Sequence, residues 1–274
     1  MEFEKNIAIV DERKTLYLEK SHEQKNAIIF LHGFPGSHNG IVEMADKVTG
    51  RRIIVPDLPG CGESEPFDIK HVLKTYAKWL NDFLDSLSIN KVVVVGHSFG
   101  ARVALMFSVY YPEKIDKLIL ITPVSKADNL VARLGSLNYK LAGFLPYKIQ
   151  KKWLFNPVYR KGEEVFVYNS SDPEVRQKLI KLNDEEIKMV DTVANAEIFE
   201  ELRSGESIIK GDKINVKTLI IGCGKDKIAS LASIKDLRNR FVNSEIVTMK
   251  NSGHLVVAEE PKVVANIINK WLKK

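Results

Sequence analysis

The sequence contains little cysteine and no long apolar segment. Its two cysteines, Cys61 and Cys223, lie far apart and form neither a disulfide framework nor the spacing of a metal site, so we expect a reducing compartment and a cytoplasmic protein. The longest apolar runs are pieces of about five residues, such as residues 27–31, whereas a membrane span needs roughly 18. The first ten residues contain two Glu and one Lys and do not form the apolar region of a secretory signal. We therefore predict a soluble protein without stable membrane insertion.

The chain also lacks a concentrated block of one charge. Its 41 basic and 35 acidic residues give a net charge of +6, are mostly interspersed, and include no run of five or more Lys or Arg. This argues against a nucleic-acid partner, and the small basic excess is expected to serve solubility. With 45% apolar and 28% charged residues, the chain is neither disordered nor fibrous. Its 274 residues predict one α/β domain with an insertion.

Short apolar runs rich in β-branched residues alternate with helix-sized segments through most of the chain. The runs comprise residues 27–31, 53–55, 91–95, 117–121, 218–221 and 245–249, and their continuous apolar character fits strands buried on both faces of a parallel sheet. Residues 7–10 and 15–18 predict a short antiparallel hairpin. Helices are predicted over residues 68–87, 99–111 and 261–272. The order predicts a doubly wound, mostly parallel, eight-stranded α/β sheet.

The alternation stops after the sixth predicted strand. We predict a helical cap over residues 124–211, inserted into a core domain made of residues 1–123 and 212–274. Residues 126–161 hold eight bases and one acid, which we interpret as a solvated helix face rather than a surface for a membrane or an acidic substrate. Leu and aromatic residues of the insertion are expected to form mostly the cap's own core and its contact with the main domain, with a few lining an apolar pocket: Leu134, Leu137, Tyr139, Leu141, Phe144, Leu145, Tyr147, Trp153, Leu154, Phe155, Tyr159, Phe166 and Tyr168.

A Gly-x-Ser-x-Gly motif follows the predicted strand over residues 91–95. Residues 96–101 read Gly-His-Ser-Phe-Gly-Ala and lead directly into the predicted buried helix. A turn from strand to helix within one residue forces Ser98 into a strained backbone conformation, which only small neighbours such as Gly96 and Gly100 permit. The hydroxyl then emerges at the carboxyl ends of the strands, where ligands bind in open α/β sheets. We predict that Ser98 is a catalytic nucleophile.

Together with two further loops, this motif resembles the α/β-hydrolase-fold serine hydrolases that carry a cap after the sixth strand. His32-Gly33-Phe34-Pro35-Gly36 follows the third predicted strand, as the oxyanion-hole motif of that family does. Residues 57–64 follow the fourth strand and match the family's Asp-x-x-Gly-x-Gly-x-Ser loop. Ala101 replaces the second Gly of many relatives but is still small. The resemblance implies an oxyanion hole made by the backbone N–H groups of Phe34 and Phe99.

A serine nucleophile needs a base, and His254 is the expected one. It lies directly after the last predicted strand and before the last helix, which is the family's place for the base in the chain order Ser, acid, His. The other histidines are expected to be structural: His22 and His71 on the surface, His38 in a loop or helix start, His32 bracing its loop, and His97 buried and directed away from Ser98.

The base in turn needs an acid that fixes its tautomer. Asp226 follows the strand of residues 218–221 through a short Gly-Cys-Gly-Lys loop, where relatives place this carboxylate. Asp128, shortly after the sixth strand, is the alternative, because some relatives carry the acid there. Asp57 ends the fourth strand and is expected to cap the glycine loop.

The resemblance implies a cofactor-free and metal-free enzyme that hydrolyses a small-molecule carboxylic ester, or a thioester, with a small to medium apolar acyl group. Cleavage of a C–C bond, of an amide or peptide, lyase chemistry and acyl transfer use the same fold and remain alternatives. A ligand receptor without catalysis on a hydrolase scaffold is a further alternative. The sequence does not indicate an oligomeric state.

Overall fold

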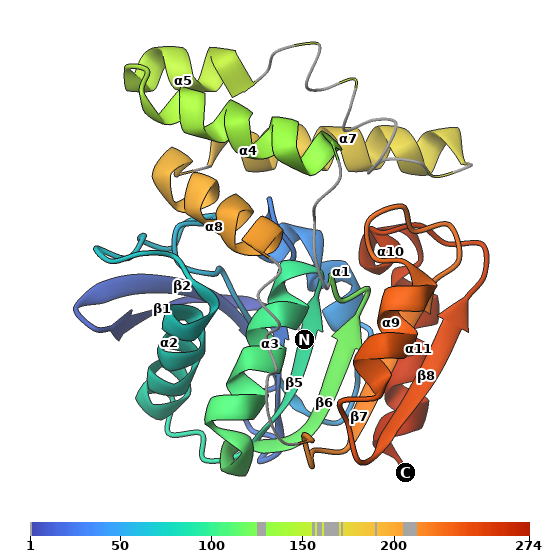
Figure 1. The fold of residues 1–274 in the computed structure, drawn as a ribbon. Helices are drawn as coiled ribbons and strands as arrows, with labels where there is room; N and C mark the ends of the chain where they lie inside the picture. Colours follow the sequence, from blue (N-terminus) through green and yellow to red (C-terminus); the bar gives the residue numbers. More distant parts are fainter. Residues whose placement is uncertain are drawn as a thin grey trace.

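The computed structural model describes residues 2–124, 130–154, 157, 161, 170, 172–189, 191–204 and 213–274. Its centre is an eight-stranded sheet with the order β1-β2-β4-β3-β5-β6-β7-β8 (Figure 1). The β1–β2 and β2–β4 pairs are antiparallel and all other pairs are parallel, as predicted. The strands are β1 (Glu4–Val10), β2 (Arg13–Lys20), β3 (Ala27–Leu31), β4 (Arg52–Pro56), β5 (Val92–His97), β6 (Ile115–Ile121), β7 (Thr218–Cys223) and β8 (Ser244–Met249).

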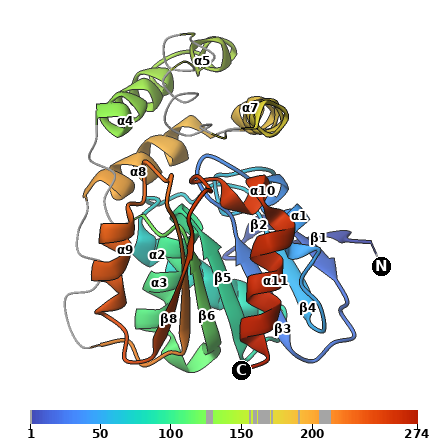
Figure 2. The same ribbon diagram turned by 90° about the vertical axis from the view of Figure 1, so that its right-hand side faces the viewer.

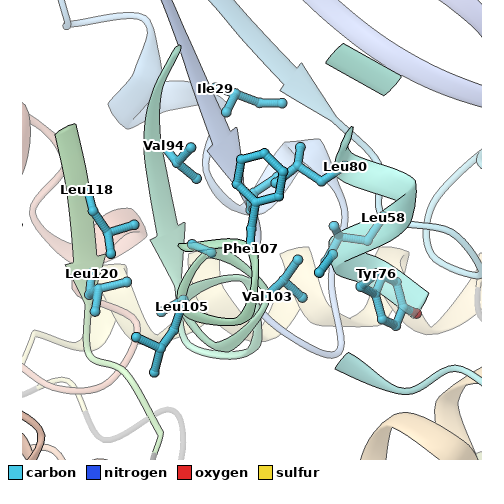
Figure 3. Packing of buried hydrophobic residues seen from close by; sticks show 14 of the residues in the cluster. Ile29, Leu58, Tyr76, Leu80, Val94, Val103, Leu105, Phe107, Leu118 and Leu120 are labelled. Carbon is cyan, nitrogen blue, oxygen red and sulfur yellow. The ribbon is translucent and has the colours of Figure 1, made fainter. Parts of the chain in front are cut away.

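The central strands of the sheet are buried on both faces, and they contain runs of consecutive apolar residues, such as residues 27–31 in β3 and 92–95 in β5. In β5, Val92 and Val94 belong to one buried cluster, whereas Val93 and Val95 belong to the other. Successive side chains of a strand point to opposite faces, so each valine pair serves one layer. Figure 3 shows the first cluster, in which Phe107 packs among side chains from the strands and from two helices. The continuous apolar runs of the sequence follow from this double burial.

Helices cover both faces of the sheet (Figures 1 and 2). One face carries α2 (Leu73–Ser86), α3 (Phe99–Tyr110) and α9 (Leu231–Arg238), and the other carries α1 (Val42–Ala45), α10 (Val256–Glu259) and α11 (Pro261–Leu272). Two 3₁₀ turns, η1 (His38–Gly40) and η2 (Pro112–Lys114), precede α1 and β6. This is the doubly wound arrangement that the alternating pattern predicted.

The predicted helix over residues 68–87 is shorter than expected at its start. Helix α2 begins at Leu73, and Val72 before it is extended, with φ −108° and ψ 158°. The preceding segment is fixed by tertiary contacts, because the backbone N–H of His71 donates to the carboxylate of Glu197 from a distant helix. The helical periodicity of the sequence could not show that competing contact.

The cap is the part of the chain that connects β6 to β7. It lies over the carboxyl ends of the parallel strands (Figures 1 and 2). Its described helices are α4 (Leu130–Gly143), α5 (Tyr147–Leu154), α7 (Pro173–Lys188) and α8 (Thr192–Ser204). Helix α8 lies nearest to the core domain, and α4 packs on α8 from the outer side. The connections through residues 125–129 and 205–212 lie outside the described residues, so the predicted domain boundaries stay predictions. Among the helices of the described ranges, none has the length and apolar character needed to cross a membrane.

Candidate active site

Ser98 occupies the single residue between β5 and α3, and its backbone is strained. Its φ of 52° and ψ of −111° lie outside the regions that L-residues favour. Small neighbours make this turn possible: a Cβ on Gly96 would collide with the carbonyl of Gly100, and one on Gly100 would collide with the backbone of Leu31. The carbonyl of Ile121 at the end of β6 accepts the N–H of Ser98. The Ser98 hydroxyl is thereby held at the edge of the sheet that faces the cap.

The structure brings Ser98, His254 and Asp226 together from three separate loops. The Ser98 Oγ–H donates to Nε2 of His254 at 2.9 Å, and the Nδ1–H of His254 donates to Oδ2 of Asp226 at 2.8 Å. Asp226 follows β7, and His254 lies between β8 and α10. All three side chains follow the carboxyl ends of parallel strands at one edge of the sheet, which is why residues so distant in sequence can meet.

Asp226 is held as a carboxylate by its surroundings. Its Oδ1 accepts the backbone N–H groups of Ile228 and Ala229 at 2.7 and 2.8 Å. Burial by itself would raise the pKa of Asp226, but the charge and hydrogen bond of His254, together with the two N–H donors, outweigh burial and keep that pKa below its usual value. The carboxylate therefore stays ionised and fixes the orientation of His254.

His97 is buried, as predicted, and holds the backbone of the His254 loop. Its Nε2–H donates to the carbonyl of His254 at 2.9 Å, and the Thr122 hydroxyl donates to the same carbonyl at 3.3 Å. Burial, followed by the neighbouring His254, lowers the pKa of His97 to about 3. His97 is therefore neutral at physiological pH and serves as a positioning residue.

The residues expected at the oxyanion hole lie next to each other. The rings of Phe34 and Phe99 are 6.3 Å apart, and Phe99 opens α3, where a backbone N–H has no acceptor within the helix. His32 braces the loop before Phe34: its Nδ1–H donates to the carbonyl of Gly33 at 2.7 Å, and its Nε2 accepts the N–H of Leu58 at 3.0 Å. Burial lowers the pKa of His32, which keeps that ring neutral.

Aromatic rings from the cap cover this loop. Phe199 of α8 stands edge-on to Phe34 with ring centres 5.0 Å apart, and Tyr139 of α4 lies 6.2 Å from Phe34. Tyr76 of α2 contacts Phe99 from below at 5.2 Å. The two residues expected at the oxyanion hole are therefore surrounded by aromatic rings. The sequence pointed to Tyr139 but not to Phe199, although the spacing of apolar residues around 194–202 would have predicted an amphipathic helix there.

Several apolar residues of the cap are not in its core, contrary to the expectation. Tyr139 and Leu154 are buried, but another group of side chains is exposed: Leu134, Leu137, Leu141, Phe144 and Trp153. The reason is that α4 is apolar on two sides and only one side packs on α8. Phe155, Tyr159, Phe166, Tyr168 and the alternative acid Asp128 lie outside the described residues.

Besides the contact of Phe199 with Phe34, polar and steric contacts join helix α8 to the core domain. His71, expected on the surface, is instead buried, and its Nδ1–H donates to Glu197 of α8 at 2.8 Å. Arg102 of α3 donates from Nη1 to the carbonyl of Leu202 at 3.2 Å, and burial lowers the pKa of Arg102 to about 10. Near the start of α8, Ala194 lies against Gly60 of the glycine loop. The cap therefore buries His71, which the sequence predicted to be exposed to solvent.

Helix α7 also contacts the core domain, through a hydrogen bond to the loop that follows Phe34. The Ser37 hydroxyl donates to the buried carboxyl of Glu186 at 2.7 Å. Burial is the main reason that the pKa of Glu186 rises to about 7, and the nearby charge of Asp57 adds to it. Asp57 itself accepts the N–H of Glu63 and both the N–H and the Nδ1–H of His38, so it caps the glycine loop as predicted.

Within the described ranges, no group of three or more His, Cys, Asp and Glu side chains could hold a metal ion. The chemistry available at Ser98 is that of a hydroxyl with an adjacent base, a fixed carboxylate and backbone N–H groups in apolar surroundings.

Comparisons with known proteins identify the family and the fold. Residues 26–261 match the family model of the alpha/beta hydrolase fold. The proline iminopeptidase of Lactobacillus crispatus is 26% identical over 91% of this chain and 90% of its own. An uncharacterized protein of Mycobacterium tuberculosis is 37% identical over 117 residues, which span 40% of this chain but only 33% of that protein. A thermophilic esterase from Thermogutta terrifontis has the same fold, with a TM-score of 0.76 at 20% identity over 98% of both chains.

Proposed function

Because the chain belongs to the α/β-hydrolase family, we propose that it is a serine hydrolase of carboxylic esters with a small to medium apolar acyl group. The observation that carries the proposal is the continuous path of hydrogen bonds from Ser98 through His254 to Asp226. Such a path turns a weakly acidic hydroxyl into a nucleophile, because the base accepts the proton while the new bond forms.

In the first half of the reaction, Ser98 Oγ attacks the ester carbonyl carbon while its proton passes to Nε2 of His254. The charge that develops on the carbonyl oxygen is stabilised by the N–H groups of Phe34 and Phe99. Asp226 stabilises the imidazolium. Collapse of the tetrahedral intermediate breaks the ester bond, and His254 protonates the departing alcohol, which leaves the acyl group on Ser98.

In the second half, water is the nucleophile and the oxygen of Ser98 is the leaving group. His254 takes a proton from the water as its oxygen attacks the acyl carbon, and then returns that proton to Ser98 Oγ. The products are the free carboxylic acid and the regenerated enzyme. One ester and one water therefore give one acid and one alcohol, and a thioester would follow the same steps.

The apolar acyl preference is supported by the rings around the oxyanion loop. Phe34 and Phe99 lie on the core side and Tyr139 and Phe199 on the cap side, with Phe34 in contact with all three of the others. An acyl chain placed among these rings would lose contact with water, and the rings themselves carry no charge.

Amide or peptide hydrolysis is the second candidate, favoured by the similarity to a proline iminopeptidase over most of both chains. The same nucleophile and base would act, and the departing amine would take the proton from His254. C–C bond cleavage, and binding without catalysis, are less directly supported.

A fluorophosphonate label followed by a matched panel of esters, thioesters and amides tests the proposal. Labelling of Ser98 together with a higher kcat/KM for esters than for amides of the same acyl group is the expected result. Ser98→Ala should abolish labelling and lower turnover by at least roughly 10³-fold. Faster turnover of the amides would assign the peptidase alternative. A folded protein that neither reacts with the label nor turns over any substrate would indicate a ligand receptor.

A further inference from the structure

The outer side of α4 carries a row of exposed apolar residues, here called the leucine stripe: Leu134, Leu137, Leu141 and Phe144. Their spacing of three, four and three residues places them on one side of the helix. The exposed fractions are 53%, 51%, 43% and 87%, respectively. Phe144 continues the last turn, because its N–H donates to the carbonyl of Leu141. The opposite side of α4, with Tyr139 and Ala142, is buried in the cap. Packing among the described residues of the cap therefore does not account for the leucine stripe.

Helix α5 extends this apolar surface. Ile149 and Trp153 are one turn apart and are 49% and 36% exposed. Helices α4 and α5 contact each other, and Figures 1 and 2 show α5 at the outer edge of the cap, with α4 between α5 and α8. Of the fourteen large hydrophobic residues exposed in the described part of the chain, six lie between residues 134 and 153. The remainder are scattered, so this concentration marks an interaction surface.

The charge of this surface selects the partner. In the sequence, residues 126–161 contain eight bases and a single acid, although some of these lie outside the residues that the structure describes. Arg133 and Lys140 are exposed beside the leucine stripe on α4, and Lys152 is exposed beside Trp153 on α5. Lys140 also pairs with Glu200 of α8, and Lys152 directly precedes Trp153 in the sequence of α5. Exposed apolar side chains flanked by Lys and Arg match the interfacial layer of an anionic membrane, where the apolar side enters the headgroup boundary and the bases meet lipid phosphates.

A second copy of the chain fits this surface less well. In a twofold dimer the same patch meets itself, so the bases of one copy would face those of the other. We propose that α4 and α5 form a peripheral docking surface for an anionic lipid bilayer, in place of the solvated face expected from the sequence, because exposed apolar residues accompany the bases. The inner side of α4 carries Tyr139 against Phe34, so the helix that lies on the lipid also roofs the candidate active site. The docking surface does not depend on the proposed esterase activity.

Flotation of the full-length protein with lipid vesicles tests the proposal. The vesicles contain phosphatidylcholine alone or phosphatidylcholine mixed with phosphatidylglycerol. The wild type is expected to float with the mixed vesicles, and Leu137→Glu/Phe144→Glu should weaken that binding by at least about tenfold. The matched control, Ile9→Glu/Val242→Glu, replaces two apolar residues of similar exposure, 59% and 62%, on the core domain and should bind like the wild type. Melting curves followed by circular dichroism establish that each variant is folded.

A charge variant separates the two contributions to binding. Lys140→Gln/Lys152→Gln should weaken binding by about fivefold per lysine at low salt and make it less sensitive to added salt. Equal binding of the wild type to uncharged vesicles, or equal losses in the control variant, would overturn the proposal. So would a wild-type dimer in analytical ultracentrifugation that Leu137→Glu/Phe144→Glu dissociates while no vesicle binding is seen, because the occupant would then be a second copy.

Discussion

A serine hydroxyl is a weak nucleophile at neutral pH, because its proton leaves only when a base within hydrogen-bond distance accepts it. Here the base, His254, lies 2.9 Å from Ser98 Oγ and is oriented by a carboxylate that two backbone N–H groups hold in place. His97 and Thr122 fix the carbonyl of the same His254. The side chain and backbone of the base are therefore both positioned before any substrate binds.

Ser98→Ala and His254→Ala are each expected to lower kcat by roughly 10³- to 10⁶-fold, measured on an activated ester. The double variant should be barely slower than either single one, because nucleophile and base act as a unit. Losses that multiply in the double variant would contradict a shared role. Unchanged thermal unfolding of the variants is the control that the fold persists.

Replacing Asp226 and Asp128 in turn shows which of these two carboxylates orients the base. Asp226→Asn should keep the fold and lose much of the rate, because an amide in place of the carboxylate no longer stabilises the imidazolium of His254. Asp128→Asn serves as the comparison and should lose little. Steady-state kinetics on one ester checks both, and the opposite pattern would move the acid to the loop after β6.

At the scale of elements, the cap is held by side chains and backbone that meet across its boundary with the core. Helix α8 receives hydrogen bonds from His71 and Arg102, and α7 receives one from Ser37. The glycine loop supplies a steric contact instead, since a Cβ on Gly60 would lie 2.5 Å from Cβ of Ala194 and 3.1 Å from Nε2 of His71. Helix α8 can therefore lie this close to the glycine loop only because Gly60 has no side chain.

Gly60→Ala is expected to destabilise the protein by roughly 1 to 3 kcal/mol more than Gly50→Ala. Both glycines have positive φ, +79° and +73°, so backbone strain is similar in the two variants. Only Gly60 faces α8, whereas a Cβ on Gly50 meets nothing within 4 Å. Urea unfolding gives the difference, and equal losses would show that α8 does not press on the glycine loop.

Glu186→Gln should raise stability at pH 8 and leave it nearly unchanged at pH 4. The folded chain holds the Glu186 proton with a pKa of about 7, against an ordinary value of 4.5, because the carboxyl is buried near Asp57. The stabilisation from protonated Glu186 is complete below about pH 4.5 and is lost as the pH rises through about 7. Gln stays neutral and can still accept the Ser37 hydroxyl, so the gain at pH 8 should reach roughly 1 to 3 kcal/mol.

Urea unfolding at the two pH values measures this difference. Glu185→Gln is the matched control, because Glu185 is the exposed neighbour on the same helix and should show no such dependence on pH. A gain for Glu186→Gln that is the same at both pH values would contradict ionisation of Glu186 as the cause.

At the scale of the whole molecule, the cap places a ceiling over the edge of the sheet where Ser98 emerges (Figure 2). Phe199 and Tyr139 form part of this ceiling, and Phe34 lies directly beneath them. A ceiling of this kind limits the size of the acyl group as well as its polarity. The acyl-chain length of the best substrate is therefore a measure of how the cap and the core domain fit together.

A series of p-nitrophenyl esters from acetate to palmitate is expected to give its highest kcat/KM among short or medium acyl chains. Each CH₂ transferred to apolar surroundings contributes about 0.8 kcal/mol, or up to roughly fourfold in kcat/KM, until the pocket is full. Pockets of typical size, ~300 to 1,000 Å³, fill before the longest chains are accommodated. Ser98→Ala gives the background rate. A rise that continues through palmitate would mean that the cap opens, and equal rates would mean that it does not form the acyl pocket.

Local sequence determined the framework of the fold. The valines of β5 are apolar at successive positions because both faces of the strand are buried, and this property is visible without a structure. The short segment from Gly96 to Gly100 likewise contains the whole strand-to-helix turn around Ser98. Asp226 and His254 were predictable as candidates because each directly follows a strand, and parallel strands end at one edge of a sheet.

Tertiary structure alone decided what the cap touches. His71 was expected at the surface but is buried against Glu197, which lies 126 positions further along the chain. Phe199 meets Phe34, and Glu186 meets Ser37, across similarly long separations. Local periodicity shows that a helix has an apolar side but not which surface that side meets. On α4, where two sides are apolar, only the packing of the cap decided that Tyr139 is buried and that Leu137 faces outward.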